Sequence, residues 1–241
     1  MTILSMLRRC LPGIAVLPLM IAAGCSQTVQ ANTKAAAVFP PMPAIAATTA
    51  MAPAKIEPAS YQGRDTGRYA AIDDGGYSLP AIDVGKVDPK FLRQLVDDPT
   101  GEPAGSIVVD TRQNFLYLVQ PNGKAMRYGV GLGKQGHAWK GRAIVQWKRK
   151  WPTWTPPASM IRRDQKLEKW RQGMQPGVTN PLGARALYIF KDGKDTLYRI
   201  HGSPQWRSIG KSASAGCVRM FNQDVIDLYD RVSGKAPLLV M

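Results

Sequence analysis

Residues 212–220 read SASAGCVRM and place Cys217 between a glycine and a strand-like run. Sixteen residues earlier, His201 stands in RIHGS, residues 199–203, at the end of another run with strand character. The chain has only three cysteines and two histidines, so few side chains can serve as a nucleophile and its base. Adjacent strands would bring Cys217 and His201 together, and this pairing is the main guide to fold and function.

Cysteine chemistry explains why the pairing matters. The thiolate is the nucleophile, and a free thiol is mostly protonated at neutral pH. A histidine within hydrogen-bond reach takes that proton, and the resulting imidazolium later protonates a leaving amine. Gly202 and Gly216 give the backbone freedom, and the N–H groups of Ala215, Gly216 and Cys217 can point at a developing oxyanion. Taken without its context, Cys217 could equally be a buried, unreactive cysteine.

The first 24 residues have the pattern of an export signal. Two arginines precede an apolar run at 11–23, which is shorter than the ~20 residues that span a membrane. Residues 21–25 read IAAGC and resemble a lipobox, where a peptidase cuts before a cysteine that carries lipid. We therefore expect a signal peptide at 1–24 and lipidation at Cys25, with an ordinary signal peptide as the alternative. The signal predicts an exported, periplasmic protein. Ser26 stands after Cys25 where an Asp is absent, which resembles the sorting pattern of lipoproteins anchored in the outer membrane.

Export affects how the three cysteines are interpreted. An oxidising compartment favours disulfides between paired cysteines. If Cys10 is removed with the signal and Cys25 carries lipid, Cys217 has no partner within the chain. An odd cysteine in an exported protein indicates a reactive thiol or an intermolecular bond.

Residues 25–85 are predicted to be a flexible linker. Up to about residue 60 they are rich in Ala, Pro, Thr and Met and offer few large apolar side chains for a core. Residues 61–85 are interpreted as more linker or as a loosely docked arm. The folded domain is then expected at 86–241, with its core at about 105–241.

The expected domain is strongly basic. Residues 86–241 hold 26 Lys and Arg against 12 Asp and Glu, which is +14 of the chain's net +15. Such a charge favours attraction to anionic surfaces such as lipid headgroups or wall polymers, or it simply gives a soluble basic surface. No basic run is interleaved with RNA-binding aromatic motifs, so we expect no nucleic-acid partner.

Strand patterns dominate the domain, with two or three helices. Asp88 and Pro89 predict a short helix over 87–96, 159–172 is compatible with a helix, and Asn222 is predicted to cap a helix near the C-terminus. Asn122-Gly123 between apolar runs is a strong hairpin signal. The fold class is therefore mainly β with a few helices, with expected strands at 106–110, 114–119, 125–131, 141–147, 186–190, 196–200 and 237–240.

Three tryptophans, Trp147, Trp151 and Trp154, lie close together in the sequence. Such a cluster could stack on a sugar ring, or it could pack a proline-rich loop onto the sheet. The sequence leaves both interpretations open.

The combined motifs resemble the L,D-transpeptidases with the YkuD catalytic domain. The family signature is matched by HGS at 201–203, IG at 209–210 and SAGCVR at 214–219. The regions upstream of the signature are matched by GSIVVD at 105–110, WPTWTPP at 151–157 and NPLG at 180–183. The resemblance covers about 86–241. It implies a YkuD-like β-sandwich or partly open barrel.

The resemblance also assigns roles to residues. Cys217 would be the nucleophile, His201 the proton donor and acceptor, and the Gly202 carbonyl would orient the imidazole, with Ala215 and Gly216 at the oxyanion. Three residues are expected to contact substrate: Arg219, Ser203 and Ser214. A structural ion pair is the alternative for Arg219. The family often has His where this chain has Ala215, so the role of base falls to His201, and no metal or cofactor is needed.

The implied reaction is acyl transfer on peptidoglycan stem peptides. Cys217 would attack the diaminopimelate carbonyl of a tetrapeptide, release D-Ala, and pass the acyl group to an amine of a second stem, forming a 3–3 cross-link. That amine could instead belong to an outer-membrane protein. The alternatives are an L,D-carboxypeptidase, with water as acceptor, and a non-catalytic wall-binding lipoprotein.

Overall fold

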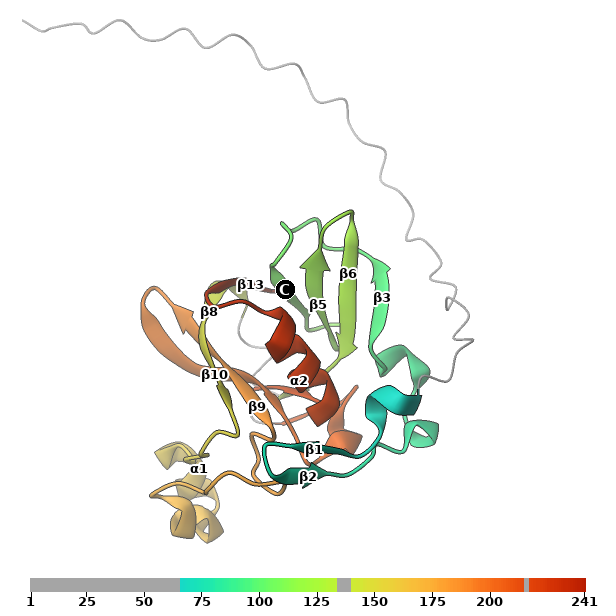
Figure 1. Ribbon diagram of the computed structural model, residues 1–241. Coiled ribbons are helices and arrows are strands. Elements are labelled where there is room, and N and C mark those ends of the chain that lie inside the picture. Colours follow the sequence, from blue (N-terminus) through green and yellow to red (C-terminus); the bar gives the residue numbers. More distant parts are fainter. Residues whose placement is uncertain (1–65, 134–139, 215–216) are drawn as a thin grey trace, which may run out of the picture. The chain divides into compact units, whose positions relative to one another are not determined.

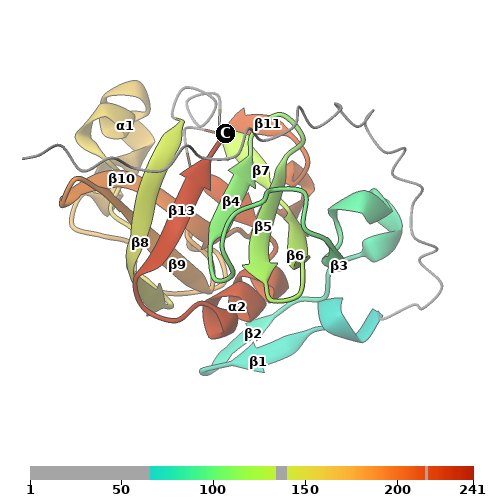
Figure 2. The same ribbon diagram turned by 90° about the horizontal axis from the view of Figure 1, so that it is seen from above.

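A computed structural model describes residues 66–133, 140–214 and 217–241 (Figures 1 and 2). Within these ranges the main feature is an eleven-stranded mixed sheet with the order β11-β7-β12-β10-β9-β8-β13-β4-β5-β6-β3. A separate two-stranded hairpin, β1–β2, lies N-terminal to it. The fold is mainly β, as the sequence predicts.

The strands follow the sequence signals closely in the central part of the chain. Asn122 and Gly123 have positive φ angles of 61° and 64°, and they turn β5 back into β6. The strand predicted at 125–131 is two strands, because the chain leaves β6 and pairs elsewhere as β7. The bounds are β1 Ile72–Asp74, β2 Tyr77–Leu79, β3 Gln94–Asp97, β4 Ile107–Asp110, β5 Phe115–Gln120, β6 Lys124–Gly129, β7 Gly131–Gly133, β8 Gly141–Lys150, β9 Arg185–Lys191, β10 Lys194–Gly202, β11 Ser212–Ser214, β12 Val218–Met220 and β13 Ala236–Val240.

The large sheet curls around helix α2, Asn222–Arg231 (Figure 1). Val225 and Leu228 on α2 are fully buried, and the same core contains Leu116 from β5 and Ile200 from β10. The helix therefore joins the two halves of the curled sheet through one hydrophobic core. This arrangement confirms the predicted β-sandwich or partly open barrel.

The helices differ from the prediction in three places. Residues 87–96 form only a short 3-10 helix, Pro89–Phe91, before β3 pairs with β6. Asn222 is not the cap of α2, because its side-chain oxygen accepts a hydrogen bond from the Ala184 N–H. The 159–172 region divides into α1, Ala158–Arg163, and a 3-10 helix, Gln165–Trp170. The remaining 3-10 helices are Thr66–Tyr69, Val84–Lys86 and Trp206–Ser208.

Residues 66–85 form an ordered arm on the domain, which agrees with the interpretation of this segment as a docked arm and not with a flexible linker. Asp74 in β1 forms two hydrogen-bonded contacts, 2.5 and 2.8 Å, with the guanidinium of Arg185, whose side chain is only 2% exposed. Tyr69 is buried and donates a hydrogen bond to Asp224 of α2. These partners lie more than 100 residues away in the sequence, so local composition does not reveal them. The rest of the predicted linker and the predicted signal lie outside the described residues.

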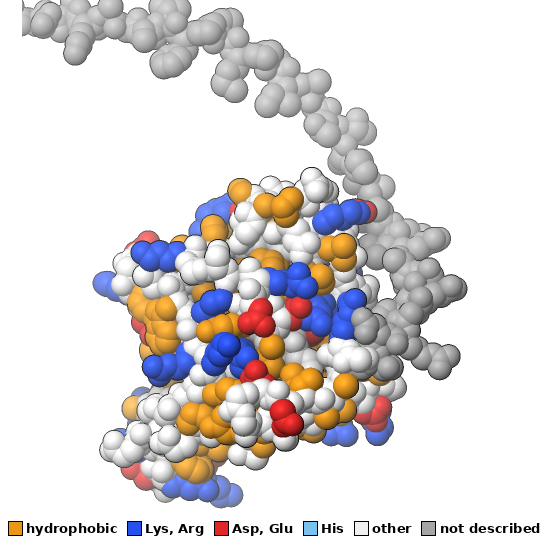
Figure 3. All heavy atoms as spheres, in the orientation of Figure 1, with side chains coloured by type: hydrophobic (Ala, Val, Ile, Leu, Met, Phe, Trp, Pro, Cys, Tyr) orange, Lys and Arg blue, Asp and Glu red, His pale blue; other side chains and the backbone are white. Residues whose placement is uncertain are grey.

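The surface carries the basic excess. Figure 3 shows one face of the molecule, on which Lys and Arg side chains are spread widely with fewer acidic side chains among them. In the part of the chain that the structure describes, no helix is both long enough and apolar enough to cross a membrane.

Candidate active site

Strands β10 and β12 bring the two predicted catalytic residues together. They pair in parallel, with Ile200 opposite Val218 and His201 opposite Arg219. Cys217 immediately precedes β12 and lies close to Arg199 of β10, whose backbone and positive charge act on its thiol. The 16-residue connection thus returns the chain to the neighbouring position in the sheet, as expected from the sequence.

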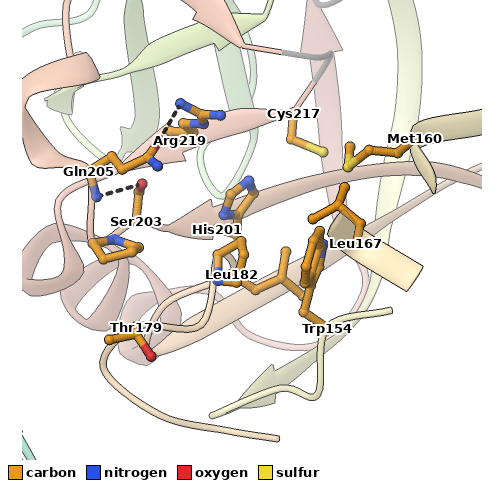
Figure 4. A pocket seen from close by; sticks show the side chains of 12 residues that line it. Trp154, Met160, Leu167, Thr179, Leu182, His201, Ser203, Gln205, Cys217 and Arg219 are labelled. Atoms are coloured by element: carbon orange, nitrogen blue, oxygen red, sulfur yellow. Dashed lines mark hydrogen bonds between the residues drawn. The ribbon is translucent and has the colours of Figure 1, made fainter. Parts of the chain in front are cut away.

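Cys217 and His201 line one pocket of about 280 Å³. Figure 4 shows them between two different walls. One wall is largely apolar, and the Cys217 thiol points to that side; the other carries polar groups. The apolar wall contains Trp154, Met160, Leu167 and Leu182, and the polar side contains Ser203, Gln205 and Arg219.

The His201 ring is held by its own backbone neighbour. Its Nδ1 lies 2.6 Å from the carbonyl oxygen of Gly202, and the residue is only 5% exposed. A carbonyl oxygen can only accept, so Nδ1 carries the hydrogen and Nε2 remains free to accept a proton. Burial lowers the pKa of His201 to about 4, against the opposing effect of hydrogen bonds to backbone groups of Gly202 and Pro181. The imidazole is therefore neutral at neutral pH.

Gly202 is required by close packing. A side chain there would overlap the carboxamide oxygen of Asn222 and approach Val225 to 3.0 Å. The backbone of Gly202 is not in the left-handed region, so the unusual backbone that the sequence suggests at this position is not present. The glycine instead lets α2 pack directly against the end of β10, and this contact fixes the carbonyl that holds His201.

The Cys217 thiol lies in a protected environment. Burial raises its pKa, although the backbone of Arg199 and the positive charges of Arg199 and Arg219 oppose the shift. Together with a neutral His201, this makes the resting pair a thiol and an imidazole. A thiol in this state needs a base at the moment of attack.

The polar side of the pocket has an available cation. The Arg219 guanidinium makes a long contact of 3.4 Å to the Gln205 side chain, and no carboxylate among the described residues lies within ion-pair distance of it. A structural ion pair, the alternative interpretation of Arg219, is therefore not observed among the described residues. Ser203 is buried, and its hydroxyl accepts a hydrogen bond from the Gln205 N–H.

The sequence motifs include Trp154 and Leu182 of the pocket wall, but the interpretation of the sequence missed the residue that holds this wall together. Asn180 is fully buried, and its side-chain nitrogen donates to the carbonyl oxygens of Pro152, Met174 and Gln175. It ties the loop that carries Trp154 to the turn that carries Leu182. The NPLG motif predicts a turn, but the burial of Asn180 and its hydrogen bond to Pro152, 28 residues away, depend on tertiary contacts that the motif does not reveal.

Several predicted site residues lie partly or wholly outside the description. Ala215, Gly216 and Cys25 are not among the described residues, and neither is the second histidine, His137. Ser214 is the last residue of β11. This strand pairs with β7, and β7 in turn pairs with β12. Among the described residues, no group of three or more His, Cys, Asp or Glu side chains is arranged to hold a metal ion.

The chain matches a protein-family model. Residues 104–240 match the model of YkuD, the L,D-transpeptidase catalytic domain. This range includes both strands of the site, the pocket walls and α2, and it excludes the arm at 66–85.

Individual relatives agree with this match. The chain is 32% identical over 130 residues to the "Probable L,D-transpeptidase ErfK/SrfK" of Escherichia coli K12, covering 52% of this chain and 40% of the relative. It is 27% identical over 241 residues to the "Probable L,D-transpeptidase YcfS" of the same strain, covering 89% and 73%. The matched part is thus about 40% of the length of the first of these relatives.

A solved structure from Brucella melitensis, described as a probable carnitine operon oxidoreductase, is 49% identical and covers 63% of this chain and 94% of its own, with a TM-score of 0.46.

Proposed function

Because the chain belongs to the YkuD family of L,D-transpeptidase catalytic domains, we propose that it is a peptidoglycan L,D-transpeptidase with Cys217 as its nucleophile. One observation carries the proposal: Cys217 and His201 line the same pocket, and the Gly202 carbonyl leaves Nε2 of His201 as the proton acceptor. A nucleophile, a base and a group that orients the base are the minimum set for covalent acyl transfer.

The first half-reaction forms a thioester. His201 Nε2 takes the Sγ proton as Cys217 Sγ bonds to the diaminopimelate carbonyl carbon of a tetrapeptide stem. The carbonyl oxygen becomes an oxyanion, which the backbone N–H groups of Ala215, Gly216 and Cys217 are proposed to stabilise. The carbonyl reforms as the C–N bond to D-Ala breaks, and the imidazolium gives its proton to the leaving amine.

The second half-reaction releases the enzyme. An amine attacks the thioester carbonyl and loses a proton to His201, and the proton then returns to the departing sulfur of Cys217. An amine on a second stem gives a 3–3 cross-link, and an amine on an outer-membrane protein gives attachment of that protein to the wall. Water in place of the amine would give an L,D-carboxypeptidase.

Arg219 is proposed to bind a carboxylate of the donor stem. It lines the pocket beside His201, and its guanidinium has no carboxylate partner among the described residues. A free cation at the polar end of a pocket is suited to the terminal carboxylate of a peptide, because a charge-assisted hydrogen bond is stronger than a neutral one. Ser203 and Ser214 are proposed to contribute to substrate binding beside it.

The proposed location follows from the N-terminal sequence. We assign residues 1–24 to a signal peptide and propose that Cys25 carries lipid, which would anchor the protein in the periplasm, at the outer membrane. Mass spectrometry of the mature N-terminus tests this, since an unmodified start at Ser26 or beyond would contradict it.

Incubation of the chain with tetrapeptide muropeptides tests the activity. Dimers with 3–3 links and release of D-Ala are expected. Tripeptides without dimers would indicate the carboxypeptidase, and an unchanged substrate would indicate a non-catalytic wall-binding protein.

A further inference from the structure

The three tryptophans that the sequence groups together have three different environments. Trp151 donates a hydrogen bond from Nε1 to Asp74 and packs on Tyr77, and Trp154 lines the pocket. Trp147, on β8, is 40% exposed although it is a large apolar side chain. Its exposure is not explained by the proposed catalytic site.

Trp147 begins a row of side chains that ends at the nucleophile. It stacks on Tyr188 of β9 with ring centroids 3.5 Å apart and an interplanar angle of 13°. The guanidinium carbon of Arg199, on β10, lies 4.3 Å from the Tyr188 ring centroid. The strand registers pair Trp147 with Tyr188 and Tyr188 with Arg199. Residues paired across a sheet share a face, so Trp147, Tyr188 and Arg199 form one row. The backbone and the positive charge of Arg199 act on the Cys217 thiol, so the row ends close to the nucleophile.

In this row Tyr188 and Arg199 are held in place, whereas Trp147 is exposed to solvent. Tyr188 is 9% exposed, and Arg199 is fixed by two contacts of 2.7 and 2.8 Å to Asp195. Ile144, 37% exposed, extends the apolar surface beside Trp147 on β8. Arg149 reaches only to 6.0 Å from the Trp147 ring centroid, and no carboxylate in the described part of the chain pairs with it. An exposed aromatic ring beside an unpaired cation suits a sugar that bears an acidic peptide.

The length of the row matches such a ligand. Three strand spacings separate Trp147 from Cys217, which is about 14 Å. In the proposed reaction the attacked carbonyl belongs to the third residue of the stem. Three extended residues and the link to the sugar together span roughly 10–14 Å. A sugar on Trp147 would therefore place that carbonyl at Cys217.

We propose that Trp147 is the platform for the sugar ring that carries the donor stem peptide, with Arg149 facing a carboxylate of that stem. This inference rests on the proposed function, since it places the reacting carbonyl at Cys217. It predicts that the enzyme binds glycan-linked stems more tightly than free stems.

Equilibrium binding tests the platform without turnover. The full chain with Cys217→Ala is titrated with a tetrapeptide and with the same tetrapeptide on its disaccharide. The disaccharide form is expected to bind about tenfold more tightly, and Trp147→Ala should remove that difference while leaving the affinity for the free tetrapeptide unchanged. Trp147→Phe should retain part of the difference, and Leu95→Ala, which removes an exposed side chain on the distant strand β3, should retain all of it.

Equal affinities for the two ligands, or an equal loss of both in Trp147→Ala, would overturn the platform. Failure of the proposed function has a different signature, because wild-type protein would then bind the sugar-linked stem without releasing D-Ala.

Discussion

The Nδ1 atom of His201 lies 2.6 Å from the carbonyl oxygen of Gly202, the next residue in the chain. This contact sets the tautomer of the imidazole and leaves Nε2 as its basic atom. Gly202 is in turn packed against Asn222, at the start of α2, so the helix at the centre of the fold fixes the orientation of the proposed base.

Replacement of His201 tests its role as base. His201→Ala should lower kcat by about 10²- to 10⁴-fold, because the Cys217 thiol then has no acceptor for its proton. D-Ala release measures kcat, and circular dichroism checks that the fold is retained. A folded variant with wild-type kcat would exclude His201 as the base.

The pH dependence of kcat/KM tests the resting protonation state. The base must be neutral to act, and the pKa of His201 is lowered to about 4. Activity should therefore persist as pH falls through 6.5 and decline only as pH approaches about 4. An acid limb centred near the ordinary histidine value of 6.5 would show that burial does not depress this pKa.

Arg219 is predicted to contribute to donor binding. Arg219→Ala should raise KM for the tetrapeptide by about 10- to 100-fold, the cost of losing a hydrogen bond to a charged group. Arg219→Lys keeps the charge and should recover part of the affinity. A donor whose terminal carboxylate is amidated should bind both wild type and Arg219→Ala equally weakly, and discrimination that survives in Arg219→Ala would place the carboxylate elsewhere.

The arm is predicted to be part of the stable domain. Asp74→Ala leaves the guanidinium of Arg185 buried without its partner and should reduce the free energy of unfolding by about 3 kcal/mol. Asp73→Ala is the matched control, since the neighbouring side chain is exposed and, among the described residues, accepts a hydrogen bond from Ser78 of the same hairpin. Urea unfolding measures both, and equal stabilities would mean that the arm is dispensable.

The sequence predicts what depends on short-range signals. Asn122-Gly123 marks a tight turn through backbone conformation, and the β-branched run at 106–110 marks a buried strand, and both features are present. The Cys217–His201 pair is predictable because both residues lie at strand ends and chemistry requires them to meet.

The features that the sequence does not reveal depend on distant partners. Asn222 is a residue type that commonly caps helices, yet its side-chain oxygen accepts a hydrogen bond from the backbone N–H of Ala184, 38 residues away. The helix expected at 87–96 gives way to β3, which pairs with β6 through residues about 30 positions further along the chain. The arm and the pocket wall held by Asn180 likewise form through tertiary contacts.

The covalent state of Cys217 tests the central claim most directly. Intact-mass spectrometry of the protein, quenched in acid after mixing with a tetrapeptide donor and no acceptor, should show an increase equal to the donor mass minus that of D-Ala. Peptide mapping should place the adduct on Cys217, and Cys217→Ala should show neither adduct nor D-Ala release. Continued release of D-Ala by folded Cys217→Ala would contradict the account.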